Sequence, residues 1–186
     1  MLTPSQIDLL ITQRSISGRQ PWASNDSQKI DDFYRTVCAA VAQSSGALSR
    51  IEWSHYGSGY ASFIDAWFYK PEVGFKVDEA LGKGGEYKGL VVLLSRLSPY
   101  FVFMEGEKRW HTKGGSSYLP ESAMLDRLLA PAIVTLAAEV QAILEKHGLV
   151  RLFKADLSTA LAPEIEVPTI LADQFTEYDA LYYWED

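Results

Sequence analysis

The hydrophobic period of this chain changes along its length, and this change constrains the fold more than any other feature. Between two segments of helical period lie two short apolar runs, Leu90–Leu94 and Tyr100–Met104, joined by a Ser98-Pro99 turn. An unbroken apolar run of this length is typical of a strand that is covered on both faces. Gly106 predicts another turn into Lys108–His111, so that the three pieces form a meander of antiparallel strands.

Helices are predicted on both sides of these strands. One lies near 28–43, where apolar residues follow the capping candidates Asn25 and Asp26 at helical spacing: Ile30, Phe33, Tyr34, Val37, Cys38 and Val41. Another lies near 122–147, where the spacing is again helical and Pro131 is expected to kink or divide the helix. A shorter helix is expected after Thr3-Pro4, with Thr3 as its cap.

This order of elements predicts an α+β fold. We expect an antiparallel sheet of about four to six strands within 48–118, packed with N-terminal and C-terminal helices. An acidic aromatic tail follows at 164–186. No internal repeat or linker divides the chain, and 186 residues suffice for one hydrophobic core. Residues 1–186 are therefore expected to form a single domain.

The net charge of −7 is concentrated in one segment. Residues 164–186 hold seven acids and no Lys or Arg, whereas the rest of the chain carries 17 acids and 17 bases. A nucleic-acid-binding protein usually gathers a basic excess on one face, so direct binding to DNA or RNA is not expected. Residues 1–163 nevertheless contain a local basic patch, which consists of Lys108, Arg109, His111 and Lys113.

Two further features bear on location. No apolar segment reaches the roughly 20 residues that span a bilayer, and Asp8 interrupts the short apolar run near the N-terminus, which lacks the basic region of a secretory signal. Cys38 is the single cysteine, which excludes a disulfide scaffold. We expect a cytoplasmic protein without membrane association, in which Cys38 is buried.

Three residues could support hydrolysis. A Mg²⁺-dependent nuclease of the restriction-endonuclease type places an Asp on one strand and Glu-x-Lys on the next, so that two carboxylates hold the metal beside a lysine. Asp65, Glu86 and Lys88 match this spacing. The alternative, which we favour, is structural. Asp65 is then a hydrogen-bonded acid near an aromatic cluster, and Glu86 and Lys88 face solvent at a strand edge.

No pattern indicates a cofactor or a metal. Gly82-Lys83-Gly84-Gly85 lacks the Ser or Thr that follows the lysine of a phosphate loop. His55, His111 and His147 have no ligand spacing with one another or with the single cysteine. We therefore expect no cofactor, no metal site and no catalytic residue.

Aromatic residues are frequent for a core of this size, with five Trp and ten Tyr. Aromatic side chains dominate the energetics of protein interfaces, and in the tail they lie among acids that favour a basic partner surface. We expect a partner to contact Trp110, His111, Glu177, Asp179, Tyr182, Tyr183, Trp184, Glu185 and Asp186. The alternative is that 173–184 forms a final helix or strand that docks its apolar side chains into the core.

In its size, its acidic character and its closing segments, Pro168-Thr169-Ile170 and Tyr178–Trp184, the sequence resembles the bacterial immunity proteins that neutralise toxins delivered between competing cells. Within that group it is similar to those paired with restriction-endonuclease-like nuclease toxins. The resemblance implies a non-catalytic protein that covers the basic active-site surface of a cognate toxin. The alternative function is a small Mg²⁺-dependent hydrolase that uses Asp65, Glu86 and Lys88.

Overall fold

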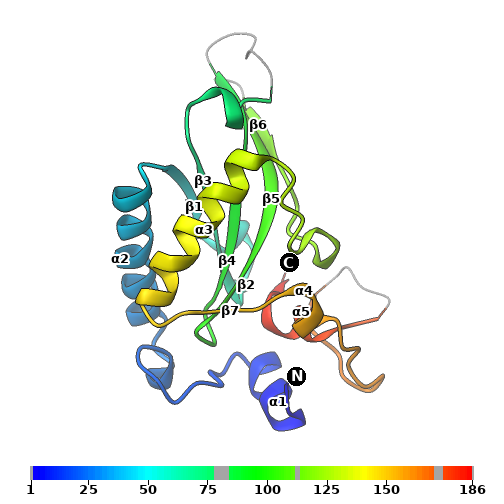
Figure 1. Ribbon diagram of the computed structural model, residues 1–186. Helices are drawn as coiled ribbons and strands as arrows, with labels where there is room; N and C mark the ends of the chain where they lie inside the picture. The colour runs from blue at the N-terminus through cyan, green and yellow to red at the C-terminus, as the bar shows by residue number, and fades with distance from the viewer. Residues whose placement is uncertain (1, 78–83, 112–113, 170–173, 186) are drawn as a thin grey trace.

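A curled antiparallel sheet with the strand order β1-β3-β4-β5-β6 lies at the centre of the molecule (Figure 1). The computed structural model describes residues 2–77, 84–111, 114–169 and 174–185. The strands of this sheet are β1 (Leu48–Glu52), β3 (Phe63–Tyr69), β4 (Gly84–Ser95), β5 (Tyr100–His111) and β6 (Gly114–Ser117), and β7 (Val150–Arg151) joins β5 in parallel. A separate antiparallel pair is formed by β2 (Tyr60–Ala61) and β8 (Trp184–Glu185).

The helices of the described chain are α1 (Pro4–Ile11), α2 (Ser27–Ser45), α3 (Pro131–Lys146), α4 (Lys154–Leu157) and α5 (Glu177–Leu181). Together with the sheet they confirm the α+β fold. Thr3 caps α1, and the carboxylate of Asp26 caps α2 by accepting the backbone N–H groups of Gln28 and Lys29. Gly46 ends α2 with a left-handed φ of 67°. The predicted helix near 28–43 is therefore confirmed.

The helix predicted near 122–147 begins later than expected. Residues 122–124 form a single 3-10 turn, and the helix starts only at Pro131. Proline is well suited to the first helical position, where its missing N–H has no partner to lose. The carboxylate of Glu105 on β5 accepts the N–H groups of Leu129 and Ala130 at 2.7 and 3.0 Å, so a strand residue stabilises the start of this helix.

β4 and β5 confirm that the two apolar runs are adjacent buried strands, because 91–94 pair in register with 101–104. The turn predicted at Gly106 is wrong. β5 continues through Gly106, which lies opposite Gly89. A Cβ atom at Gly106 would lie only 2.3 Å from Cδ1 of Tyr118, so this glycine makes room for a ring that covers the strand.

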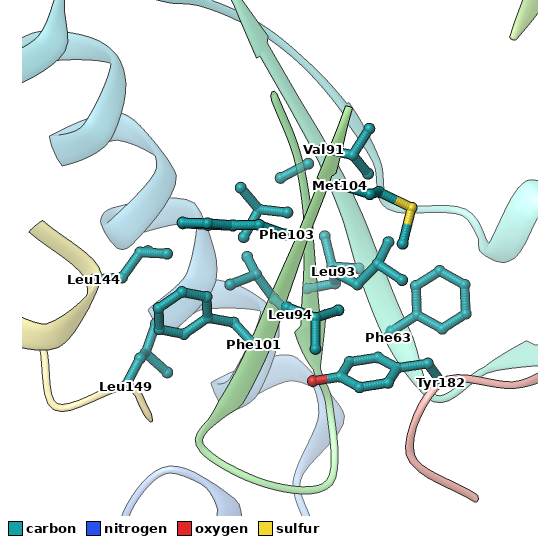
Figure 2. Close-up of a cluster of buried hydrophobic side chains, with 14 of the residues drawn as sticks. Phe63, Val91, Leu93, Leu94, Phe101, Phe103, Met104, Leu144, Leu149 and Tyr182 are labelled. Atoms are coloured by element: carbon teal, nitrogen blue, oxygen red, sulfur yellow. The ribbon is translucent and has the colours of Figure 1, made fainter. Parts of the chain in front are cut away.

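The strand register divides the sheet into two faces. The helical face packs against α2 and α3, and its buried side chains are Ile64, Ala66, Phe68, Leu90, Val92, Leu94, Phe101 and Phe103. Figure 2 shows Leu144 of α3 beside Phe101 and Phe103, whereas Val91 and Met104 point to the opposite side of the sheet. We call that opposite side the aromatic face.

Large rings fill the aromatic face at the end where β4 begins. Trp67 stacks on Tyr69 with ring centroids 4.5 Å apart, and Tyr87 stacks on Trp110 at 5.6 Å. A Cβ atom at Gly89 would lie 2.4 Å from Nε1 of Trp67. The glycines of the central strands therefore admit the indole rings of this face.

The hydrophobic core includes Cys38, which is buried on α2 as its position on the apolar stripe predicts. No helix in the part of the chain that the structure describes is long and apolar enough to cross a membrane.

Candidate partner-binding cleft

The end of the chain is folded into the body of the molecule. The side chains of Tyr182 and Tyr183 are each 1% exposed. The hydroxyl of Tyr183 donates to the carbonyl oxygen of Leu10 at 3.0 Å, and the ring of Tyr182 packs edge-on against Phe63. The rings of both tyrosines belong to the core, so little of either is accessible for the partner contact that the sequence predicts.

Glu177 is also internal, with 2% of its surface exposed. Its Oε1 accepts the backbone N–H of Leu2 at 2.8 Å, and this contact ties α5 to the start of the chain. The partner contact expected of Glu177 would need an accessible carboxylate, whereas this carboxylate is enclosed by protein. The alternative interpretation of 173–184, a final helix or strand that docks its apolar side chains into the core, agrees with the positions of α5 and β8.

The other expected residues of the tail lie closer to the surface. Asp179 is half-buried, and its Oδ2 accepts the N–H and hydroxyl of Thr176 at 2.7 and 2.8 Å. Trp184 is half-buried against Phe63. Glu185 accepts a hydrogen bond from the side chain of Gln13 at 3.0 Å. Asp186 lies outside the described residues.

Asp179 and Trp184 share a cleft of about 480 Å³. Its opposite wall is the segment 119–123, and the hydroxyl of Tyr178 joins the two walls by donating to the carbonyl oxygen of Pro120 at 3.0 Å. We call it the acidic cleft, because Glu121 and Asp179 are the charged residues among the described residues that line it. The buried rings of the closing tyrosines form its floor.

Sequence reasoning missed one wall of this cleft. Glu121 and Leu119 are exposed, the latter by 60%, and both reach the cleft from the segment that follows β6. The sequence Leu119-Pro120-Glu121 contains no local pattern that indicates a binding site. Their proximity to Asp179 arises from a contact between residues far apart in the chain, which no periodicity reports.

Trp110 and His111 do not share this site. Trp184 packs on Phe63, which pairs with Ser95 at one end of β4. Trp110 pairs with Gly85 at the other end of that strand, about 34 Å away at roughly 3.4 Å per residue. His111 follows it at the end of β5. The expected partner-binding residues thus fall into two regions.

The residues of the hydrolase alternative do not converge. Asp65 pairs with Leu93, and both side chains point to the aromatic face. Glu86 and Lys88 lie an odd number of residues from Leu93 along β4, so their side chains point to the opposite, helical face. Glu86 lies about 24 Å further along β4, at roughly 3.4 Å per residue. It forms an ion pair with Arg109 at 2.6 Å, and Lys88 lies 3.6 Å from Glu107. In the described chain, no three His, Cys, Asp or Glu side chains form a metal-binding group.

Asp65 instead occupies a closed hydrogen-bonding site. Its two carboxylate oxygens accept the hydroxyls of Tyr56 at 2.8 Å and Tyr118 at 2.5 Å. Burial raises the pKa of Asp65 above its usual value, although nearby Lys108 and the two hydroxyls act in the opposite direction. This arrangement matches the structural alternative, a hydrogen-bonded acid near aromatic rings.

Comparisons with protein-family models, with curated proteins and with solved structures found no match to this chain.

Proposed function

We propose that this chain is a non-catalytic binding protein that neutralises a bacterial toxin by covering its active site, and that the acidic cleft contacts the basic surface of that toxin. The observation that carries the proposal is the composition of the cleft. Its described lining combines Glu121 and Asp179 with the indole of Trp184 and has no Lys, Arg or His. A surface of this kind attracts a cationic partner and offers apolar area for close contact.

Two considerations support binding over hydrolysis. Asp65 is separated from Glu86 and Lys88 by the thickness of the sheet and by the length of β4, so the three do not line a common cleft. The resemblance to immunity proteins supplies the class of partner. A nuclease toxin presents a basic groove to phosphates, and an acidic cleft complements such a groove. Protection of this kind operates in the cytoplasm of the cell that makes the toxin.

The test uses the protein encoded by the neighbouring gene, purified with its catalytic residue inactivated. Association with the chain is measured at low and high salt. Glu121→Gln combined with Asp179→Asn is expected to slow association and flatten its salt dependence, because two charges that steer the partner are lost. Trp184 is not a suitable probe, since its ring also packs on Phe63.

The matched control is Glu164→Gln combined with Glu166→Gln. Both residues are exposed acids of the same tail, and neither lines the acidic cleft. This pair removes the same charge and is expected to leave association nearly unchanged. Equal effects of the two pairs would show that general acidity, and not the cleft, attracts the partner. Absence of binding and of inhibition by the wild-type chain would contradict the proposal altogether.

A further inference from the structure

The two edges of the main sheet approach each other. β1 and β6 lie at opposite ends of the strand order, with β3, β4 and β5 between them. Even so, the guanidinium carbon of Arg50 on β1 lies 3.9 Å from the ring centroid of Trp110 on β5. Met104 is the residue of β5 in line with Arg50. In a flat sheet, Trp110 would therefore lie about 14 Å across the strands and about 20 Å along them from Arg50, beyond the reach of the two side chains. The sheet therefore curls toward its aromatic face at this end.

A slot of about 320 Å³ separates the two edges. β1 contributes 50–52 to its lining, and β5 and β6 contribute 108–110 and 115–117. Arg50 and Lys108 point to the aromatic face, whereas Ile51 and Ser116 belong to the opposite face. The lining therefore comes from β1 at one edge of the sheet and from β6 with its neighbour β5 at the other, which places the slot between the two edges.

Both edges carry main-chain groups that no strand of the described chain pairs. β1 pairs with β3 alone, and β6 pairs with β5 alone. The N–H of Tyr118 donates to the carbonyl of Glu107 in continuation of the β5–β6 register. Because inward and outward groups alternate in an antiparallel pair, the N–H and C=O of Ser117 point away from β5. Outward groups of this kind are the template for strand addition.

The slot has the opposite charge to the acidic cleft. Its lining contains Arg50, Lys108 and Arg109 against the single acid Glu52. The carboxylate of Glu52 already accepts the N–H of Ser54 at 2.6 Å. The cations that point to the aromatic face are Arg50 and Lys108, each stacked on a ring. A strand placed in the slot would direct alternate side chains toward them.

We propose that this slot binds an extended acidic segment of a partner protein, which adds as a strand between β1 and β6 and places alternate Asp or Glu side chains beside Arg50 and Lys108. The lengths of β1 (Leu48–Glu52) and β6 (Gly114–Ser117) limit the paired part of the segment to four or five residues. This surface is separate from the acidic cleft and does not depend on the function proposed above.

The test measures fluorescence anisotropy of a labelled peptide, acetyl-Thr-Glu-Val-Glu-Val-Thr-amide, added to the full chain. Two matched peptides serve as controls. One replaces both Glu residues by Lys, and the other keeps them but carries N-methyl groups on alternate residues, which removes the main-chain donors along one edge of the peptide. The acidic peptide is expected to bind at least about tenfold more tightly than either control, because the site uses both charge and strand pairing.

Protein variants locate the site. Arg50→Gln combined with Lys108→Gln is expected to weaken peptide binding about tenfold. The matched pair is Arg35→Gln combined with Lys29→Gln, which also removes one arginine stacked on a tryptophan and one lysine, both on α2. That pair is expected to leave peptide binding unchanged. Glu121→Gln with Asp179→Asn should also leave it unchanged, which separates this proposal from the acidic cleft.

Three results would overturn the proposal. Equal binding of the acidic and N-methylated peptides would exclude strand addition. Binding of a single-stranded oligothymidine in place of the acidic peptide would assign the stacked rings and cations to nucleic acid. Sedimentation of the free chain as a dimer that Arg50→Gln with Lys108→Gln dissociates would identify a second copy as the occupant.

Discussion

The carboxylate of Asp65 joins three segments of the chain through two tyrosine hydroxyls. Tyr56 approaches from the turn before β2, and Tyr118 from the segment after β6. Burial raises the pKa of Asp65 above the ordinary value of 3.8 that applies to the unfolded chain. The folded protein therefore holds this proton more tightly than the unfolded chain. The ionised carboxylate lowers stability, and this cost grows as the pH rises from the unfolded pKa through the folded pKa.

Replacing Asp65 by Asn removes this titration while keeping groups that can bond both hydroxyls. We expect the free energy of unfolding of the wild type, relative to Asp65→Asn, to fall as the pH rises from the unfolded pKa of 3.8 through the raised folded pKa. Urea unfolding across that range measures the difference. Glu164→Gln, at an exposed acid, is the control. If the difference in free energy of unfolding between the wild type and Asp65→Asn stayed constant with pH, the pKa of Asp65 would be the same in the folded and unfolded states.

Gly106 also has a role that depends on one contact. A Cβ atom there would lie 2.3 Å from the ring of Tyr118, which also holds Asp65. We expect Gly106→Ala to lower the free energy of unfolding by about 2 kcal/mol, since crowding a packed site displaces its neighbours. Gly59→Ala, where the added Cβ meets nothing within 4 Å, is the control for urea unfolding. Similar losses in both variants would exclude the steric explanation.

The start of α3 depends on a strand. Glu105 on β5 accepts N–H groups just before and at the helix cap, a task that a local side chain usually performs. Glu105→Ala is expected to lower the free energy of unfolding by about 1 kcal/mol, as the loss of a capping side chain does. Glu107→Ala, two positions along the strand, removes only an exposed ion pair with Lys88 and is expected to cost less. Urea denaturation compares them, and equal losses would contradict a capping role.

At the scale of elements, the sequence predicts those helices and strands whose formation depends on local interactions. The stripe of α2, its Asp26 cap and the paired apolar runs of β4 and β5 all appear in the sequence because each reflects periodic burial or capping. The turn predicted at Gly106 is wrong because glycine is needed there to make room for the ring of Tyr118, which is a tertiary contact. The late start of α3 was missed because the group that stabilises it, Glu105, lies on a strand.

The candidate site is less accessible to such reasoning. The composition of the tail identifies Asp179 and Trp184, which line the acidic cleft. It also selected Tyr182 and Tyr183, which are buried against Phe63 and Leu10, two residues far away in the sequence. The opposite wall, including Glu121, is brought near by tertiary packing alone. A sequence can thus indicate a charged aromatic segment, but its exposed part depends on the whole fold.

At the scale of the molecule, the contacts between the first and last segments determine how the chain reaches its native state. The bond from Leu2 to Glu177 spans 175 positions, and the bond from Tyr183 to Leu10 spans 173. Contacts of such long range require loop closure before they contribute any stabilisation, which makes folding slow. We expect the central hairpin of β4 and β5 to form early, and α1 and α5 to join late. Until they do, the apolar surface around Phe63 remains exposed to water, and the nascent protein is at its most prone to aggregation.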